Sequence, residues 1–371
     1  MRSSAKAGSK GRTKAGGKDS VQTVAASSAS AAPTDTLSGS ESEAPLVSRV
    51  FAALADGHFH SGEELAEKLG VSRSAVWKAG NSLRELGATL HAVRNRGYRL
   101  VAVSEPLNAA KIREHLIRAV RDRVQFLDVA WTVSSSNTVL LERPNPPNGS
   151  CEASLAEYQT AGRGRRGRAW IAPPGGAICL SVSWTFREVP ADLGALGLVI
   201  GVCSLRALAS LGVTNAKLKW PNDLLVEDRK LGGILIELRA ESAGPACVVI
   251  GIGLNVSLGA ALLQAIAETG VAPTDLVTAG LNQPCRNEIA ASLVTAYVRG
   301  LLEFEKDGLK PFSEEWLNAD ALRGRPVTVQ APDGVVKGLA RGIDLHGALI
   351  VETPLGLRKF ISGDVSVRAT S

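Results

Sequence analysis

The chain has 371 residues, of which 45% are hydrophobic and 21% charged, as expected for a globular protein with a sizeable core. Its formal net charge of +6 permits an anionic partner without requiring one. The five cysteines include no Cys-x-x-Cys pair and the five histidines form no His-Glu-x-x-His motif, so we expect buried, reduced thiols and no structural zinc site. No apolar run of about 18 residues is free of charged and turn residues, so we expect no membrane-spanning segment.

Residues 1–44 are predicted to form a disordered, basic tail. They are rich in Ser, Ala, Gly and Thr, lack apolar periodicity, and carry six Lys or Arg and no acid in their first 18 positions. A signal peptide would need an apolar stretch after these charges, and none follows. A nucleic-acid-binding arm and a solvated tail both fit this composition.

Residues 45–103 have the pattern of a winged helix-turn-helix domain. Apolar residues recur at helical spacing from Val47 to Leu54, and Ser61-Gly-Glu-Glu64 is a capping box that opens a second helix. A third helix is expected after Ser72, and a β-hairpin from Thr89 to Val101. In such a fold the third helix faces the major groove of DNA and the basic wing meets phosphates.

The residues predicted to contact DNA are Ser72, Arg73, Ser74, Trp77, Lys78, Arg94 and Arg96. A winged domain used only for packing or dimerisation is the alternative. Gly80 favours that alternative, because a glycine inside a helix costs about 1 kcal/mol relative to alanine.

Two further domains follow a short linker. Residues 107–322 alternate strands and helices, which indicates a mixed α/β domain, with strands expected at 124–131, 152–159, 177–186, 216–219, 224–227, 231–239 and 246–257 and long helices at 193–211 and 287–305. Residues 324–371 contain short strands between turn residues, typical of a small β-barrel, at 326–330, 335–343, 347–352, 357–361 and 365–368.

The segment from Gln159 to Trp170 carries four arginines and three glycines between two predicted strands. Glycines let a backbone approach a phosphate closely, and guanidinium groups bind phosphate oxygens in pairs. The loop is expected to be mobile when empty, because its like charges repel, and to order over a polyanion. A solvated basic loop or an RNA contact is the alternative.

A second polar segment runs from Lys217 to Asp223 and continues from Arg229 to Glu237. Asn222 and Asp223 are expected in a turn that faces a cleft, where Asp223 could hold a magnesium ion. Lys230 opens a strand, and the glycines after it leave room for a ligand. A plain hairpin with charged tips is the alternative.

Two smaller motifs complete the candidate site. The Gly-x-Gly at Gly251 lacks the third glycine of a dinucleotide fingerprint, but Asn255 beyond it could read an adenine edge. Ser135, Ser136 and Asn137 stand at a strand-to-helix switch, where hydroxyls and helix amides can bind a small polar group; ordinary N-capping is the alternative. Arginines, a lysine, an acid and glycine loops without a nucleophile suit adenylation of a carboxylate by ATP.

Together these motifs resemble those of the BirA family of biotin–protein ligases and biotin-operon repressors. The resemblance rests on Gly162–Arg168, Lys219–Asp223, Arg229–Glu237 and Gly251–Asn255, which occur in the family's order and spacing. It implies a multidomain α/β (α+β) protein with an N-terminal winged helix-turn-helix, a class II synthetase-like catalytic domain with a mixed sheet, and a C-terminal SH3-like β-barrel.

The resemblance also implies the activity and its partners. Biotin and ATP, with Mg²⁺, would give biotinyl-5′-adenylate, and biotin would then pass to a lysine of the biotin carboxyl carrier protein of acetyl-CoA carboxylase. The protein would be cytoplasmic, would form a homodimer in its adenylate-bound state, and would repress transcription at operator DNA.

Site residues follow from the same resemblance. Those implied to contact biotin or its adenylate are Ser135, Ser136, Asn137, Gln159, Arg163, Gly164, Arg165 and Lys230. Arg163 and Lys230 would stabilise charge at the α-phosphate, Asp223 would support magnesium or the biotin ring, and Asn255 and Arg368 would bind ATP. Three alternatives stay open: a ligand-sensing winged-helix transcription factor without ligase activity, a ligase whose winged domain no longer binds DNA, and a lipoate ligase.

Overall fold

The structure is a computed structural model, and it describes residues 44–101, 105–239, 246–268, 272–332, 334–361 and 366–369. All but the last residue of the predicted tail, 1–44, lies outside the described residues. The described chain contains an N-terminal helical region, a central region built on a large sheet, and a C-terminal region built on a smaller sheet.

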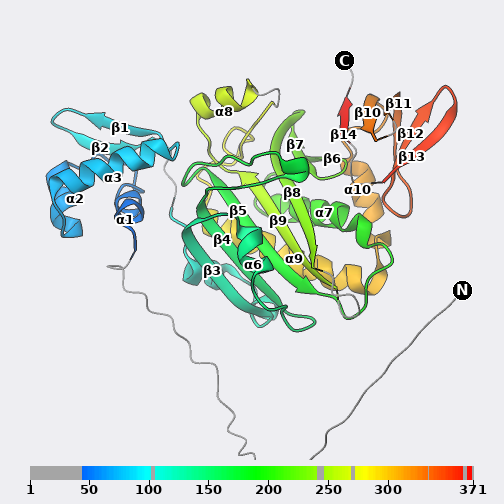
Figure 1. The fold of residues 1–371 in the computed structure, drawn as a ribbon, viewed down its shortest axis with the longest axis horizontal. Coiled ribbons are helices and arrows are strands. Elements are labelled where there is room, and N and C mark those ends of the chain that lie inside the picture. Colours follow the sequence, from blue (N-terminus) through cyan, green and yellow to red (C-terminus); the bar gives the residue numbers. More distant parts are fainter. Residues whose placement is uncertain are drawn as a thin grey trace, which may run out of the picture. The chain divides into compact units, whose positions relative to one another are not determined.

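The N-terminal region has the elements expected of a winged helix-turn-helix (Figure 1). They are α1 (Leu46–Ala53), α2 (Gly62–Leu69), α3 (Arg73–Glu85), β1 (Leu90–Val93) and β2 (Gly97–Leu100). The capping box at the start of α2 is formed: the Glu64 amide donates to Ser61 Oγ, and Glu64 accepts from the Ser61 amide. Gly70 ends the helix in the left-handed conformation, with a φ of 65°.

The central region is built on a seven-stranded mixed sheet in the order β3-β4-β5-β9-β8-β7-β6. Its strands are β3 (Val124–Val133), β4 (Cys151–Gln159), β5 (Ala177–Thr185), β6 (Lys217–Lys219), β7 (Asp223–Val226), β8 (Arg229–Arg239) and β9 (Cys247–Asn255). β3 and β4 pair in parallel, and the other neighbours pair antiparallel. The mixed sheet predicted for this domain is therefore confirmed.

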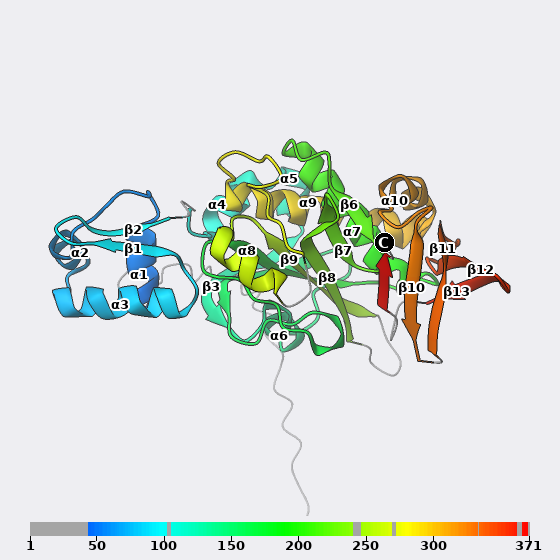
Figure 2. The ribbon, with the colours of Figure 1, turned by 90° about the horizontal axis from the view of Figure 1, so that it is seen from above.

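Helices cover the two faces of this sheet unequally. The long helices α7 (Leu196–Ser210) and α9 (Arg286–Asp307) lie against one face, and the short α6 (Ser136–Leu141) lies against the other (Figures 1 and 2). Both long helices match their predicted positions to within three residues. The remaining helices of the region are α4 (Ala109–His115), α5 (Arg118–Arg121), α8 (Ala260–Ala267) and α10 (Ser313–Ala319).

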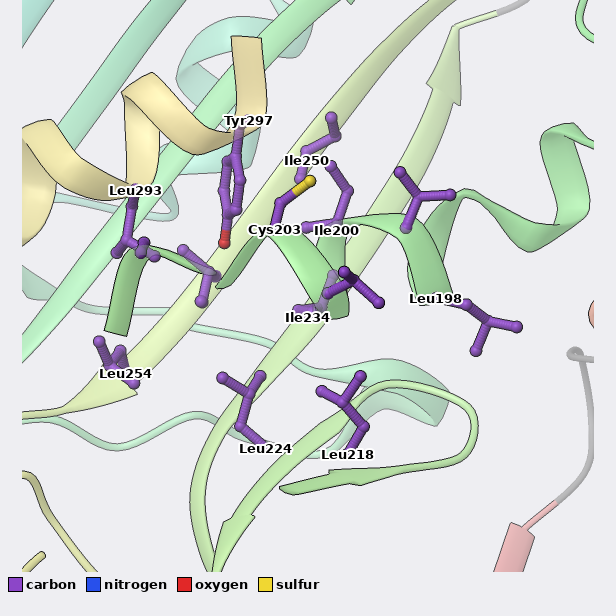
Figure 3. Packing of buried hydrophobic residues seen from close by; sticks show 14 of the residues in the cluster. Leu198, Ile200, Cys203, Leu218, Leu224, Ile234, Ile250, Leu254, Leu293 and Tyr297 are labelled. Carbon is purple, nitrogen blue, oxygen red and sulfur yellow. The ribbon is translucent and has the colours of Figure 1, made fainter. Parts of the chain in front are cut away.

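The hydrophobic core fills the space between the sheet and the long helices. Figure 3 shows Cys203 of α7 and Tyr297 of α9 packed together with Ile234 and Ile250 of the strands. α7 is the one helix within the described ranges that is long and apolar enough to span a membrane, but 61% of its most apolar window is buried in the protein. Its apolar character is explained by this burial on nearly all sides.

The C-terminal region is an antiparallel sheet in the order β13-β12-β11-β10-β14. Its strands are β10 (Pro326–Ala331), β11 (Gly334–Ile343), β12 (Leu349–Thr353), β13 (Gly356–Phe360) and β14 (Ser366–Ala369). All five predicted strands are present, each within about two residues of its expected position. Val327, Val329 and Leu349 belong to the same hydrophobic cluster as the central sheet, so the two regions share one core.

All five cysteines are free, as expected from their spacing. Four are buried, whereas Cys285 is only half-buried, which corrects the expectation of buried thiols at that position. Cys285 stands just before α9, at the end of a loop that reaches the surface.

Candidate active site

Alternation along the central strands gives the sheet an apolar face and a polar one. In β5, Leu180 and Val182 point into the core. Ser181 and Ser183 alternate with them along the strand and therefore point toward the face that carries α6. β9 continues this polar face, because Ser181 is opposite Gly251 in the register of the two strands. The candidate site is built on this face, which the long helices leave open.

The start of α6 brings four predicted ligand-binding residues together. Ser135, Ser136 and Asn137 are each no more than 5% exposed. The Ser136 amide donates to Gln159 Oε1 at 2.8 Å, so the helix N-terminus is tied to the end of β4. Ser181 Oγ lies 2.8 Å from Ser136 Oγ and 2.5 Å from Asn137 Oδ1. The arrangement is a compact, buried cluster of polar side chains rather than a simple helix cap, because the Ser135 side chain makes no capping hydrogen bond.

The Gly-x-Gly motif of β9 has a structural role that the sequence did not indicate. A Cβ on Gly251 would lie 2.3 Å from Asn137 Oδ1, and a Cβ on Gly253 would lie 2.3 Å from the Trp170 ring. Both glycines therefore leave room for other side chains of the site. Trp170 is the last residue of the arginine-rich segment Gln159–Trp170, hereafter the arginine loop. Its ring covers β9 at this point, and its buried indole nitrogen has no hydrogen-bond partner.

The arginine loop is tied down by its own side chains. Arg163 Nη1 donates to Thr138 Oγ1 at 2.9 Å, and Arg163 Nη2 lies 3.1 Å from both carboxylate oxygens of Glu237. Arg165 Nη1 donates to Asn222 Oδ1 at 3.4 Å. The sequence predicted that repulsion among the arginines makes the empty loop mobile. In the structure Arg163 pairs with Glu237 of β8 and Thr138 of α6, and Arg165 pairs with Asn222, so these contacts oppose the repulsion.

The backbone of the loop is also closed on itself. The Gly164 amide donates to the Arg168 carbonyl at 2.7 Å, and the Trp170 amide donates to the Gly162 carbonyl at 2.8 Å. Arg166 lies at the tip with a φ of 60°, a left-handed conformation. These bonds fold residues 162–170 into a hairpin-like loop.

The predicted lysine and acid of the second segment form an ion pair. Lys230 Nζ donates to Asp223 Oδ1 at 2.7 Å, and the two side chains are 27% and 24% exposed. Gly233 lies beneath them: a Cβ there would be 3.3 Å from Lys230 Nζ. The turn that carries Asp223 follows a cis peptide bond between Trp220 and Pro221. The structure thus places the Lys230 ammonium group of β8 beside the turn that carries Asn222, the partner of Arg165.

The residues present do not form a magnesium site by themselves. Within the described ranges there is no group of three or more His, Cys, Asp or Glu side chains that could hold a metal ion. Asp223, the predicted ligand, already accepts from Lys230. Mg²⁺ commonly binds through one or two carboxylates and substrate phosphates. A metal role for Asp223 therefore stays a prediction, and no chemical step below is assigned to it.

The two residues predicted to bind ATP have different outcomes. Asn255 is 5% exposed, and its Nδ2 donates to the Thr274 carbonyl at 2.9 Å and the Lys230 carbonyl at 3.4 Å. Its amide thus braces the strand that carries Lys230, so its donors face protein backbone. Arg368 is in β14, and its side chain lies outside what the structure describes.

Cys179 lies on the polar face of β5, beside this site, but its thiol is not poised to act as a nucleophile. Burial raises the pKa of its thiol to about 11, so the thiol stays protonated at neutral pH. The prediction that the site works without a cysteine nucleophile is consistent with this protonation state.

Three family models match the chain. They are the Biotin/lipoate A/B protein ligase family over residues 130–255, the Biotin protein ligase C terminal domain over 323–368, and the HTH domain over 50–99. The bifunctional ligase/repressor BirA of Escherichia coli is 38% identical over 321 residues, which span 86% of this chain and 97% of that protein. This chain belongs to the BirA family.

Other members and relatives of the BirA family agree with this assignment. The BirA of Bacillus subtilis is 30% identical and is covered over 95% of its length. The biotin–[acetyl-CoA-carboxylase] ligase of Mycobacterium tuberculosis is 35% identical over 67% of this chain and 90% of its own length. Among solved structures, the biotin protein ligase of Aquifex aeolicus in complex with biotin and ATP matches with a TM-score of 0.57 and 25% identity, over 66% of this chain and all of that one.

The winged region of this BirA-family chain exposes the residues predicted to contact DNA. Ser72 caps α3 by accepting from the Ala75 amide, and Trp77 is 55% exposed. On the wing, the Arg96 guanidinium lies 4.3 Å from the centre of the Phe59 ring. The predicted residues that stand exposed are Ser72, Arg73, Ser74, Trp77, Lys78, Arg94 and Arg96.

Gly80 has a packing role that accounts for its position in α3. It is buried, and a Cβ at this position would lie 3.3 Å from the Leu90 side chain and 3.7 Å from the Tyr98 ring. The glycine therefore faces the hairpin rather than the exposed side of the helix. Gly80 therefore does not by itself favour a winged domain used only for packing or dimerisation, because its cost serves close contact between helix and wing.

Sequence reasoning missed several residues of the site. Glu237 and Thr138 hold Arg163, Ser181 supports Asn137, and Trp170 covers Gly253. Glu237 was visible as the last residue of a motif, and strand alternation could have placed it on the polar face. Its pairing with a loop 74 residues away in sequence could not be read from any local pattern.

Proposed function

We propose that this protein is a biotin–protein ligase that forms biotinyl-5′-adenylate and transfers biotin to a lysine of the biotin carboxyl carrier protein of acetyl-CoA carboxylase. The observation that carries the proposal is the gathering of the α6 N-terminus, the arginine loop and the Lys230–Asp223 turn on one open face of the sheet. BirA of E. coli, which is 38% identical, is named a bifunctional ligase/repressor, and the A. aeolicus ligase was solved with biotin and ATP.

In the first step a carboxylate oxygen of biotin attacks the α-phosphorus of ATP. A new P–O bond forms to biotin, the bond to the bridging oxygen breaks, and pyrophosphate leaves with the electron pair. We assign charge stabilisation at the α-phosphate to Arg163 and Lys230, because guanidinium and ammonium groups stabilise charge that develops on phosphate oxygens. Magnesium bound to the phosphates of ATP would supply further charge neutralisation.

In the second step the amine of the acceptor lysine attacks the acyl carbonyl of the adenylate. The C–N bond forms, the C–O bond to the phosphate breaks, AMP leaves, and the amine loses a proton. Biotin is proposed to bind at the start of α6, where a helix amide and serine hydroxyls gather in one buried polar cluster. The residues assigned to biotin or adenylate are Ser135, Ser136, Asn137, Gln159, Arg163, Gly164, Arg165 and Lys230; those assigned to ATP are Asn255 and Arg368.

We further propose that the winged region makes the protein a repressor that binds operator DNA as a homodimer. The exposed Trp77 and basic wing support this role. We assign residues 45–103 to the DNA-binding domain, 107–322 to a class II synthetase-like catalytic domain, and 324–371 to an SH3-like barrel. A cytoplasmic location is proposed as well, because five free thiols suit a reducing compartment.

The deciding experiment is biotin-dependent exchange of labelled pyrophosphate into ATP by the purified protein. Exchange that requires biotin is expected. Its absence would leave the alternative of a ligand-sensing winged-helix transcription factor without ligase activity. Exchange with lipoate in place of biotin would instead favour a lipoate ligase.

The repressor role is tested separately by a gel-shift assay with the protein's own promoter region. We expect a shift that requires biotin and ATP together and that weakens steeply with salt, since binding releases counterions from the phosphates. Ligase activity without any shift would identify a ligase whose winged domain no longer binds DNA.

A further inference from the structure

Glu237, near the end of β8, connects three parts of the candidate site. Asn137 Nδ2, on α6, donates to Glu237 Oε2 at 2.7 Å. Arg163 Nη2, on the arginine loop, lies 3.1 Å from each carboxylate oxygen. The Glu237 carboxylate thus accepts from two residues to which the proposed function assigns ligand contacts.

The two contacts of Arg163 fix its guanidinium from two sides. Nη2 faces Glu237, and Nη1 donates to Thr138 Oγ1 at 2.9 Å. Nη1 uses one hydrogen, and Nη2 shares one between the two carboxylate oxygens, so the group can be held in place and still donate to a phosphate. The Arg163 side chain is only 34% exposed, which strengthens its attraction to the carboxylate relative to a surface pair.

The contact with Asn137 fixes an amide orientation. Because Nδ2 donates to Glu237, Oδ1 must face Ser181 and the space above Gly251. With a neutral residue in place of Glu237, either end of the amide could turn toward β8. The carboxylate therefore orients a buried polar group as well as a charged one.

We propose that Glu237 is a positioning residue that holds Arg163 and Asn137 in their ligand-binding arrangement before the ligand arrives. A loop with four arginines between residues 163 and 168 would otherwise be opened by repulsion among its like charges, and an opposite charge at its base offsets that repulsion. Prearranged donors cost little reorganisation when charge develops during the reaction. The claim rests on the proposed function only for the identity of the ligand.

The first test needs no enzymatic activity. Glu237→Gln keeps the shape of the side chain but turns an amide NH₂ toward donors that need an acceptor. We expect trypsin to cleave after Arg163, Arg165, Arg166 or Arg168 at least about five-fold faster in the ligand-free variant, since the loop opens more often. Mass spectrometry of the loop fragments separates these cuts from cleavage elsewhere. Glu352→Gln, which removes a carboxylate from the Arg341 pair in the C-terminal sheet, is the matched control.

The second test measures pyrophosphate exchange. Glu237→Gln is expected to lower kcat about ten-fold with an unchanged melting temperature, because Arg163 is present but poorly held. Combining it with Arg163→Ala should slow exchange by less than the product of the two single effects, since Glu237 acts in part through Arg163.

Wild-type rates of loop cleavage in Glu237→Gln would overturn the proposal, as would a loss of exchange that multiplies with that of Arg163→Ala. If the wild-type protein shows no exchange, the proposed function fails, and loop cleavage alone then decides the role of Glu237.

Discussion

At the scale of single residues, the site depends on charges placed beside one another and on glycines that leave room for them. Lys230 and Asp223 pair above Gly233, and Asn137 occupies the space that a side chain at position 251 would fill. The Lys230–Asp223 pair is partly exposed and can be changed without touching the core of the sheet, whereas Asn137 and Gly251 are in close contact, so a change there affects stability as well.

Lys230→Ala is expected to slow biotin-dependent exchange by about 10²- to 10³-fold, because the ammonium group that stabilises the α-phosphate is removed. The fold should be intact, since the lysine is 27% exposed and pairs with an acid that solvent also reaches. Exchange kinetics and circular dichroism check both points. Lys306→Ala, at a surface pair of α9, is the control, and exchange by Lys230→Ala within a few-fold of the wild type would contradict the role.

Gly251→Ala should weaken biotin binding by about ten-fold or more and destabilise the protein by about 1–3 kcal/mol, because the new methyl group overlaps Asn137 Oδ1. Titration calorimetry with biotin and urea unfolding measure the two effects. Gly194→Ala is the matched control, since a Cβ there meets nothing within 4 Å. Equal biotin affinity in both variants would place the ligand away from Asn137.

At the scale of elements, the segments between secondary structures couple the parts of the molecule. The segment that joins α10 to β10 passes along β6: the Ala321 amide donates to the Leu218 carbonyl at 2.8 Å. Asp320 beside it is half-buried, and its Oδ2 has no hydrogen-bond partner. Burial raises the pKa of this carboxyl to about 6, so the connection contains a titratable group that resists ionisation.

The stability contribution of Asp320 should therefore depend on pH. Because its folded pKa of about 6 is above its ordinary value of 3.8, the carboxyl is uncharged in both states below about pH 4, and the wild type loses stability as pH rises through 6. Asp320→Asn cannot ionise, so it should gain on the wild type by up to about 3 kcal/mol between these pH values. Urea unfolding of both proteins at pH 4.5 and 7.5 checks this, and a difference that does not change with pH would refute it.

At the scale of the whole molecule, the C-terminal sheet is joined to the turn that carries Asp223. Trp220, fully buried at the start of that turn, donates its indole N–H to the Gly347 carbonyl at 3.1 Å. Gly347 itself packs against α7, where a Cβ would lie 2.9 Å from the side chains of Ala195 and Leu198. A displacement of the C-terminal sheet would therefore also move the turn that carries Asp223, and with it the Lys230–Asp223 pair.

Trp220→Phe keeps an aromatic ring but removes this hydrogen bond, which costs about 1–3 kcal/mol because a buried carbonyl loses its partner. We expect a several-fold rise in the KM for ATP in the exchange assay. Trp184→Phe is a matched control, since Trp184 is equally buried and its indole nitrogen has no partner. Similar kinetics in the two variants would show that the C-terminal sheet does not position the turn.

The elements that depend on local sequence patterns could be predicted without the structure. The capping box of α2, the long helices α7 and α9, the strands and the glycine-bearing loops could be predicted, because capping, periodicity and turn chemistry act over a few residues. The candidate residues from Ser135 to Lys230 followed from motif spacing, and the structure gathers them on one face.

Which of the predicted side chains contact one another could be seen only in the folded protein. Glu237 contacts Arg163, Asn137 contacts Gly251, and Trp220 contacts Gly347. The residues of each pair are too far apart in sequence for a periodic pattern to predict the contact. The folded protein also shows that Gly80 and the Gly-x-Gly of β9 make room for side chains. The physical reason is that a contact between distant segments depends on the register and stacking of whole elements, which the complete packed core sets rather than any short stretch of chain.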